Sequence, residues 1–116
     1  MEKDSVQCSH ILLKHNKSRT PLDRVRNIPI TRSIEEAREI IKLIRSLLVI
    51  QNLEKFELLA QVYSECSSAV EGGNLGQFGR GDMQEAFETV AFGLKIGELS
   101  QPVETDSGVH LILRTK

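Results

Sequence analysis

The sequence predicts a single α+β domain with a small antiparallel sheet. β-forming segments lie near both ends of the chain, and three segments with helical periodicity lie between them. A further short β-forming segment interrupts the helices, so the prediction is a four-stranded sheet surrounded by helices. The length of 116 residues fits one domain, residues 1–116, and we expect residues 1–5 to be flexible.

The first predicted strand is SVQCSHILLK, residues 5–14, which alternates in character and is rich in β-forming residues. Successive side chains of a strand point to opposite faces of the sheet. One face of this strand therefore carries Val6, Cys8, His10 and Leu12.

The clearest helix covers SIEEAREIIKLIRSLLVIQ, residues 33–51. Ser33 and Glu36 have the spacing of a capping box, in which each side chain accepts a backbone hydrogen bond from the other residue. The packing face predicted from the helical spacing consists of Ile34, Ala37, Ile40, Ile41, Ile44, Leu47 and Leu48.

Two shorter helices are predicted further along the chain. The first covers residues 53–65, and its expected packing face consists of Phe56, Leu59, Ala60 and Tyr63. The second covers residues 83–94, and Gly93 stands where a glycine commonly follows the last helical residue.

The remaining strands are predicted from short β-forming runs and turn residues. The segment LGQFG, residues 75–79, reads as a short strand between helices. Residues 97–116 read as two strands joined around the turn-forming triplet Asp106-Ser107-Gly108. A closing antiparallel hairpin is therefore expected.

Composition excludes several classes of protein. Hydrophobic residues make up 40% and charged residues 27% of the chain, which is ordinary for a globular domain. The apolar run LIRSLLVI is too short to span a bilayer, and the N-terminus lacks the apolar region of a secretion signal. Cys8 and Cys66 lie outside any CxxC pair and indicate reduced thiols in the cytoplasm or nucleus. We expect a monomer without membrane association.

The glycine-rich stretch GGNLGQFGRGDM, residues 72–83, does not fit a nucleotide-binding loop. A dinucleotide fingerprint leaves a strand and opens a helix, whereas this stretch follows a predicted helix. A P-loop needs Gly-Lys followed by Ser or Thr, and that tripeptide does not occur in the chain. The glycines instead indicate unusual backbone dihedral angles around Leu75, Gln77 and Phe78.

Positive charge is concentrated near the N-terminus. Residues 1–32 contain seven Lys or Arg and three Asp or Glu, a charge of +4, so the remainder carries −5. An isolated run of this kind is commonly a solvated loop. No aromatic residue is interleaved for base stacking, so we expect no nucleic-acid partner, and a site for one small anion fits better. The basic residues are Lys14, Lys17, Arg19, Arg24 and Arg26.

Two histidines, His10 and His110, stand inside apolar strands. A lone histidine in a strand is more often a core residue than a catalyst. If the first and last strands are neighbours, however, the two imidazoles can hydrogen-bond to each other, which fixes both tautomers. Such a pair serves either a structural role or the orientation of a reactive centre.

Cys66, in the segment SECSS, leaves several interpretations open. A free cysteine is often buried filler. A dyad with His110, aided by Asp106, would make a cysteine hydrolase, although no hydrolase signature surrounds the residue. Cys8, His10, Cys66 and His110 together offer zinc ligands with unusual spacing. Alternatively, Cys66 lies beside a substrate carbonyl without forming a bond to it.

Four motifs in order carry a family resemblance: CSHILLKH followed by SR, SECSSA, GGNLGQFGRGDMQEAFE, and the C-terminal GELSQPVETDSGVHLILR. They resemble the parvulin family of peptidyl-prolyl cis/trans isomerases across almost the whole chain. The basic KHNKSR segment and Cys66 are similar to the branch that prefers phospho-Ser/Thr-Pro bonds. A WW domain often precedes that branch, and we expect none here because about nine residues precede the core of the first strand and tryptophan is absent.

The resemblance implies an FKBP-like fold, no cofactor and no metal, and it implies a role for each site residue. Phosphorylated Ser/Thr-Pro proteins or peptides are the implied partners. The implied catalytic residues are His10, Cys66, Ser107 and His110, with Thr105 in the same network. The implied proline pocket consists of Leu75, Met83 and Phe87, with Gln84 as a hydrogen-bonding partner of the substrate backbone. The implied phosphate ligands are Lys14 and Arg19.

The implied reaction needs no covalent bond to the enzyme. Rotation about an X-Pro bond is slow because it breaks amide resonance, and a site that favours the twisted amide accelerates it by differential binding. One residue departs from the family pattern, which has two adjacent arginines where this chain has Arg19 and Thr20. Threonine cannot replace the bidentate geometry of a guanidinium. The alternative function is therefore a phosphopeptide-binding module on the same fold with weak or no turnover.

Overall fold

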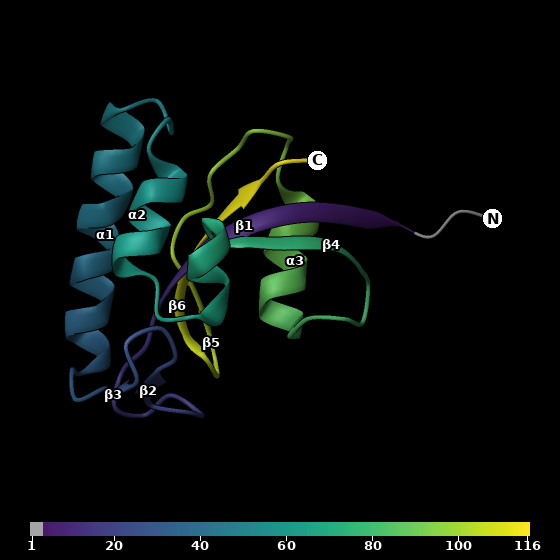
Figure 1. Cartoon of the computed structure of the whole chain (residues 1–116). Coiled ribbons are helices and arrows are strands. Elements are labelled where there is room, and N and C mark those ends of the chain that lie inside the picture. Colours follow the sequence, from purple (N-terminus) through teal and green to yellow (C-terminus); the bar gives the residue numbers. More distant parts are fainter. Residues whose placement is uncertain (1–3) are drawn as a thin grey trace.

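Four antiparallel strands form the central sheet in the order β4-β1-β6-β5, and Figure 1 shows β1 passing through the middle of the molecule. The computed structural model describes residues 4–116. Its helices are α1 (Ile34–Ile50), α2 (Phe56–Tyr63), the 3-10 helix η1 (Ser67–Glu71) and α3 (Glu85–Gly93). Its strands are β1 (Ser5–Leu13), β2 (Leu22–Asp23), β3 (Ile28–Pro29), β4 (Asn74–Gly79), β5 (Val103–Thr105) and β6 (Gly108–Arg114). The predicted four-stranded α+β architecture is confirmed.

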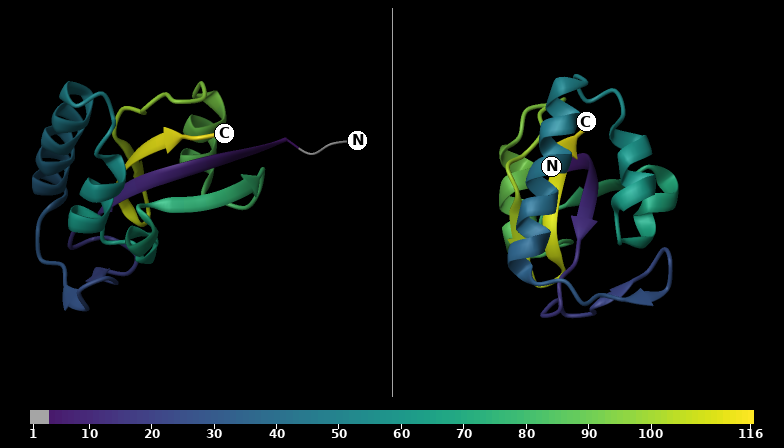
Figure 2. Two further views of the ribbon diagram at one scale, coloured as in Figure 1. Left: turned by 45° about the horizontal axis from the view of Figure 1, so that its top comes forward. Right: turned by 90° about the vertical axis from the view of Figure 1, so that its left-hand side faces the viewer.

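Helices cover both faces of this sheet. Figures 1 and 2 show α1 and α2 together on one side and α3 on the other. Alternate residues of the two central strands supply the two cores: Ile11 and Leu111 pack toward α1 and α2, whereas Cys8 and Ile112 pack toward α3. The second core also contains Phe87 and Phe78. The two central strands are therefore largely buried on both faces, and a polar residue on them needs a specific partner.

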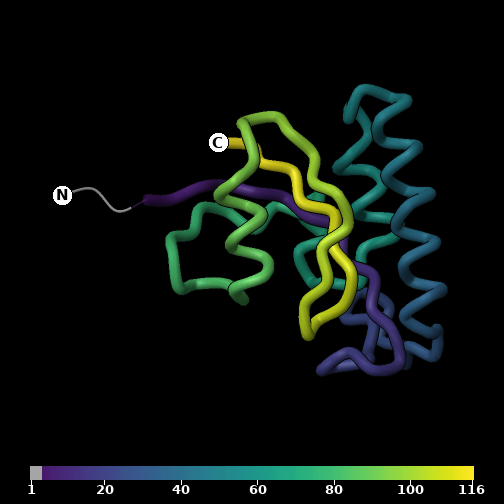
Figure 3. Tube along the Cα trace, turned by 180° about the vertical axis from the view of Figure 1, so that it is seen from behind, coloured from purple at the N-terminus to yellow at the C-terminus, as the bar shows by residue number. Residues whose placement is uncertain are grey.

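The first and last strands of the chain are neighbours. In the register of β1 and β6, His10 lies opposite Ile112 and Leu12 lies opposite His110. Figure 3 shows the hairpin of β5 and β6 running alongside β1, between α1 and α3. His10 and His110 are thus diagonal neighbours on the face that α3 covers.

The capping box of α1 is confirmed. The Ser33 side chain accepts from the amide of Glu36, and the Glu36 carboxylate accepts from the amide of Ser33. The predicted packing face is wider than the observed one, because Leu47 is 45% exposed while Leu48 is completely buried. The same correction applies to Tyr63 in α2, which is 42% exposed because α2 packs through Phe56 and Ala60.

Gly93 does not act as the predicted left-handed residue after a helix. It is the last residue of α3, and its φ is not among the positive values of the chain. The residue that follows the helix is Leu94, and its backbone is extended. Residue 84, which precedes the helix, uses its side chain elsewhere, as described below.

Three short elements escaped the sequence prediction. The strands β2 and β3 have two residues each, and η1 is a single short helix, so none of them is long enough to show a period. β2 and β3 fold residues 14–30 into a compact excursion at one end of the sheet. There the amide of Arg19 donates to the carbonyl of Asp106 at 2.8 Å, which joins this excursion to the β5–β6 turn.

Gly73 explains why the glycine-rich stretch begins with two glycines. Its φ is +85°, and a Cβ there would lie 2.3 Å from the carbonyl oxygen of His10. The amide of His10 donates to the carbonyl of Gly73 at 2.9 Å. Only glycine permits this approach, which brings the start of β4 against the β1 residue that carries an imidazole.

The described residues contain no helix that is both long enough and apolar enough to cross a bilayer. The expectation of flexibility for residues 1–5 falls largely on residues 1–3, which lie outside the described part of the chain. Within that part, Ser5 begins β1.

Candidate functional site

Two histidine side chains form the centre of the site. His10 Nδ1 and His110 Nδ1 are 3.0 Å apart, and both residues are buried. One nitrogen donates and the other accepts, so the pair cannot hold two imidazolium ions in this geometry. The predicted contact between the two histidines is therefore present.

His110 is held in its neutral form. Burial, and to a smaller extent the charge of His10, together lower the pKa of His110 to about 3. Its second nitrogen, Nε2, lies 2.7 Å from the hydroxyl oxygen of Thr105. Both nitrogens of His110 are thus engaged by neighbouring side chains.

A chain of hydrogen bonds continues on both sides of the histidine pair. His10 Nε2 lies 3.2 Å from the hydroxyl of Ser68, in η1. On the other side, the hydroxyl of Thr105 accepts from the amide of Ser107 at 3.1 Å. The network links η1, β1, β6 and the β5–β6 turn across the sheet face.

Gln84 fastens this turn to the start of α3. Its side-chain amide donates to the hydroxyl of Ser107 at 3.0 Å, and its side-chain oxygen accepts from the amide of Asp106 at 3.1 Å. The side chain makes no capping bond to α3. It therefore ties together two segments that are more than twenty residues apart in sequence.

An apolar pocket of about 200 Å³ lies above the histidines. All of the sequence-predicted proline-pocket residues and four of the five predicted catalytic residues line it: Leu75, Met83, Gln84, Phe87, His10, Cys66, Ser107 and His110. Leu12 completes the lining. The structure thus brings together residues from β1, β4, α3 and the C-terminal hairpin.

Phe87 forms the base of this pocket and is also a core residue. It is 4% exposed, and its ring meets His110 and His10 edge to face at centroid separations of 5.2 and 5.7 Å. It also packs against Phe78. Phe87 therefore belongs both to the core and to the lining of the pocket.

Cys66 stands at the entrance of η1, half-buried beside the histidine pair. Burial raises the pKa of its thiol, but His10 and the groups of Ser68 favour the thiolate and together lower that pKa to about 6. Cys8, in contrast, has its pKa raised to about 11 by burial in the core, an effect that Arg114 only partly offsets. The two cysteines therefore differ in chemistry as well as in position.

The hydrolase and zinc interpretations of Cys66 do not match this geometry. The two ring nitrogens of His110 are engaged by His10 and Thr105, which leaves neither free to act as the base of Cys66. Across residues 4–116, no three His, Cys, Asp or Glu side chains converge as metal ligands do. Cys8 belongs to the core cluster under α3.

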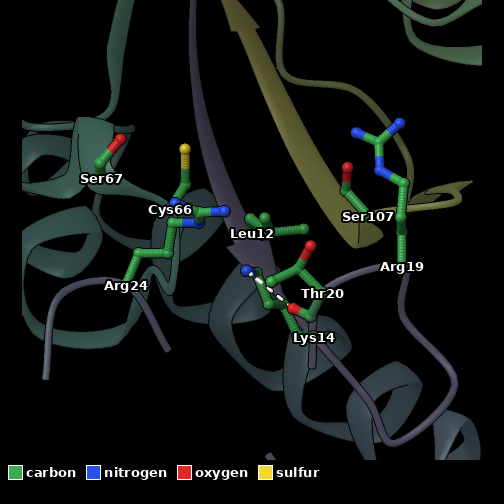
Figure 4. Close-up of a pocket in the computed structure, with 8 residues that line it drawn as sticks. All are labelled: Leu12, Lys14, Arg19, Thr20, Arg24, Cys66, Ser67 and Ser107. Carbon is green, nitrogen blue, oxygen red and sulfur yellow. Dashed lines mark hydrogen bonds between the residues drawn. The ribbon is translucent and has the colours of Figure 1, made fainter. Parts of the chain in front are cut away.

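A second pocket, of about 240 Å³, adjoins the first and is lined by cationic side chains. Figure 4 shows Arg24 beside Cys66 on one side, Arg19 beside Ser107 on the other, and Lys14 near Thr20. Leu12, Cys66 and Ser107 line both pockets. The predicted phosphate ligands Lys14 and Arg19 thus lie at one pocket that borders the apolar one.

Lys14 is more constrained than the sequence indicated. It is 5% exposed, and its Nζ donates to the carbonyls of Thr20 at 3.0 Å and Leu22 at 2.7 Å. Burial lowers the pKa of Lys14, and the nearby charge of Arg24 lowers it further. Arg19 is exposed, and among residues 4–116 no hydrogen bond or ion pair engages its guanidinium.

Buried acids support the walls of this basic pocket. Glu65, which precedes Cys66, accepts from the backbone amide of Lys14 at 2.8 Å and from Arg32 at 2.6 and 3.0 Å. Arg32 also donates to the carbonyl of Lys14. One bidentate ion pair therefore fixes the end of β1 relative to the residue before the thiol.

Sequence reasoning missed two contributors to the site. Ser68 lies in the SECSS segment with Cys66, but nothing in a single sequence pairs it with His10. Arg24 was listed among the basic residues without a role, yet it lines the basic pocket. Nine residues separate Lys14 from Arg24 in the sequence, and the two come to line one pocket only because β2 folds the segment back.

Comparisons with known proteins agree with this site. Residues 10–116 match the family model described as Rotamase, PPIC-type PPIASE domain. The chain is 50% identical over 111 residues to the Drosophila melanogaster protein dodo, which covers 96% of this chain and 66% of that protein. It is 47% identical over 116 residues to peptidyl-prolyl cis-trans isomerase Pin1 of Arabidopsis thaliana, which covers 97% of both.

A solved structure shows the same fold. Peptidyl-prolyl isomerase ESS1 from Candida albicans superposes with a TM-score of 0.92 at 39% identity, over 97% of this chain and 63% of that one. The fold and the site define a peptidyl-prolyl isomerase of the parvulin class. The chain belongs to the PPIC-type, or parvulin, family, and within it resembles the Pin1 and ESS1 isomerases. The predicted isomerase class is confirmed, and a binding module without turnover is not favoured.

Proposed function

We propose that this isomerase acts on phospho-Ser/Thr-Pro bonds, with the proline ring in the apolar pocket and the phosphate in the basic pocket. The observation that carries the proposal is the wall that the two pockets share, made of Leu12, Cys66 and Ser107. In such a substrate the phosphorylated residue immediately precedes proline. An apolar pocket bordering a cationic one matches that covalent arrangement.

Each wall of the apolar pocket has a task in the proposal. Leu75, Met83 and Phe87 grip the proline ring through dispersion and burial of apolar surface. Gln84 is the predicted partner of the substrate backbone, and its side chain already positions Ser107. A firm grip on the ring lets the preceding carbonyl rotate relative to a fixed proline.

The chemistry asked of the site is rotation about one bond. The barrier of about 18–20 kcal/mol arises from amide resonance, which places partial negative charge on the carbonyl oxygen of the planar bond. Twisting the bond removes part of that charge. A site therefore accelerates rotation when it stabilises the twisted form more than the planar form.

Cys66 suits this task without acting as a nucleophile. A pKa of about 6 means that much of the thiol is ionised at neutral pH. A thiolate near the substrate carbonyl repels the oxygen of the planar amide more than that of the twisted amide. His10 and His110, fixed to each other at 3.0 Å, hold this electrostatic environment in place.

The test is a protease-coupled isomerisation assay on matched peptides. We expect kcat/KM to be highest for phospho-Ser/Thr-Pro, intermediate for Glu-Pro and lowest for Ala-Pro. The preference should weaken as salt screens the exposed guanidinium groups. Equal rates on phosphorylated and unphosphorylated peptides would contradict the proposal.

Arg19→Ala isolates the contact with phosphate. Because hydrogen bonds to charged groups contribute about 1.5–3 kcal/mol, we expect kcat/KM for the phosphorylated peptide to fall by about tenfold or more. The rate on Ala-Pro should barely change. An equal loss on both peptides would assign Arg19 to folding or to general backbone binding.

A further inference from the structure

The basic pocket contains a second guanidinium besides that of Arg19. Arg24 lines the pocket next to Cys66 and Ser67, and Figure 4 shows it facing Arg19 from the opposite side. Its side chain is exposed, and no hydrogen bond or ion pair in residues 4–116 engages its guanidinium. An unpaired guanidinium at a pocket is available for an anion.

The backbone of Arg24 is fixed although its side chain is free. Its amide donates to the carbonyl of Glu65 at 3.2 Å, directly before Cys66. On its other flank, the buried carboxylate of Asp23 accepts from the amides of Val25 and Arg26 at 2.8 and 3.0 Å. These hydrogen bonds therefore fix the backbone of Arg24 at the start of a tight turn.

Two buried acids close to this pocket already have cationic partners. Asp23 is paired with Arg26 at 3.0 Å, and Glu65 is paired with Arg32 at 2.6 Å. Arg26 also donates to the carbonyls of Ser64, Gln61 and Val62 at the end of α2. Positive charge from Arg19 and Arg24 is thus left without an opposing carboxylate among the residues that line the pocket.

We propose that Arg24 supplies the second guanidinium for the substrate phosphate, opposite Arg19, while Lys14 mainly holds the loop that carries Thr20 and Leu22. The proposal rests on the phospho-Ser/Thr-Pro function described above and assigns the specificity residues of that site. It accounts for the threonine at position 20, because Arg24 on the opposite wall of the pocket replaces the second arginine that the family has next to Arg19. Two planar forks on opposite sides can each bind phosphate oxygens in bidentate fashion.

The contacts of Lys14 support this division of roles. Two of its three ammonium hydrogens are committed to the carbonyls of Thr20 and Leu22, and the side chain is almost entirely buried. Lys14 and Arg24 line the same pocket, and the pKa of Lys14 is lowered by burial and then by the positive charge of Arg24. A buried ammonium between two carbonyls is a loop clamp with one donor left for a ligand.

The experiment compares Arg24→Ala with Lys17→Ala. Both variants remove one positive charge from the same segment, but Lys17 does not line the pocket. We expect Arg24→Ala to lower kcat/KM for a phospho-Ser-Pro peptide by on the order of tenfold and to leave the Ala-Pro rate within twofold of wild type. Lys17→Ala should change the phosphopeptide rate by less than twofold. Arg24→Lys should be intermediate, because it keeps the charge and loses the fork.

The outcomes separate this inference from the proposed function. If wild type shows no phosphate preference, the function itself fails. If wild type shows the preference and Arg24→Ala behaves like Lys17→Ala, only the role of Arg24 is overturned. Equal loss on phosphorylated and unphosphorylated peptides would also overturn it, since Arg24 would then act through Cys66. A thermal melt of each variant, expected to match wild type, shows that folding is not the cause.

Discussion

The two adjoining pockets differ in what holds them together. Regular elements supply most of the apolar pocket, and its lining residues His10, Phe87 and His110 are each 4% exposed. The excursion of residues 14–30 supplies half of the residues that line the basic pocket, and the side chains of Arg19 and Arg24 there are exposed. In the first pocket the ligand-facing side chains are themselves part of the core. In the second pocket, backbone hydrogen bonds of residues 14–30 and buried ion pairs make the contacts with the rest of the protein, and the exposed arginine side chains do not.

This difference predicts how each pocket tolerates change. A substitution in the apolar pocket affects stability and activity together, because the same atoms serve both. A substitution of an exposed arginine affects selectivity alone, because the pinned backbone stays in place. The proposed phosphate recognition is therefore free to vary on a fold whose apolar pocket is constrained.

Phe87→Ala should produce the largest effect. Removing a buried aromatic ring from beneath the histidines and Phe78 should cost about 3–5 kcal/mol of unfolding free energy and most of the isomerase activity. Met83→Ala, at a half-buried residue of the same pocket, should lower kcat/KM with a much smaller loss of stability. Denaturant unfolding and the isomerase assay on both variants check this.

The contrast between the two pockets is contradicted if Phe87→Ala has the same melting temperature as wild type. Phe87 would then belong to the ligand site alone, and the apolar pocket would be no more coupled to the core than the basic one. Full activity in a strongly destabilised Phe87→Ala variant would also contradict the contrast, because Phe87 would then belong to the core alone.

Acid should destabilise the apolar pocket before it affects the basic one. The native pKa of His110 is about 3, below its ordinary value of 6.5, so between these values the unfolded chain binds a proton that the native state does not. The stability contributed by neutral His110 is therefore complete above about pH 6.5 and is lost as pH falls toward 3. The lowered pKa values of Asp23 and Glu104 remove stability only below their ordinary values of 3.8 and 4.5.

Two measurements check the acid prediction. Thermal melts should show a falling Tm from pH 6.5 to 4.5, and the ring protons of His110 should not titrate by NMR in that range. The Cys66 thiol affects the pH dependence of stability in a different pH range, between its native pKa of about 6 and its ordinary pKa of 9.0. Titration of His110 near 6.5 in the folded protein would show that burial does not hold it neutral.

Thr20→Arg should have the smallest effect of the three. If residue 20 points to where a phosphate binds, an added guanidinium raises the preference for phosphopeptides a few-fold over wild type. The backbone carbonyl that accepts from Lys14 is unchanged by this substitution. Asn16→Arg adds the same charge at an exposed residue that does not line the pocket, so an equal gain in both variants would reduce the effect to long-range attraction.

Local patterns in the sequence were sufficient for the main elements. The capping box at Ser33, the alternation of residues 5–14 and the turn at Asp106-Ser107 each depend on neighbours within a few residues, and all three are present in the structure. The likeness of the motifs to parvulins carried the isomerase class and every site residue that was predicted from the sequence, but not Arg24. What local patterns overestimated was burial, as the exposed Leu47 and Tyr63 show, because the number of helix faces that are covered depends on neighbouring elements.

Long-range contacts settled the rest. Ser68 meets His10, Gln84 meets Ser107, and Arg24 meets the pocket of Arg19 only because distant segments fold onto one sheet face. The same holds for the charge states: burial and the charge of His10 lower the pKa of His110 to about 3, whereas the groups around Cys66 outweigh its burial and lower its pKa to about 6. A propensity or a period is a property of adjacent residues, whereas desolvation and a shared pocket wall are properties of the packed chain.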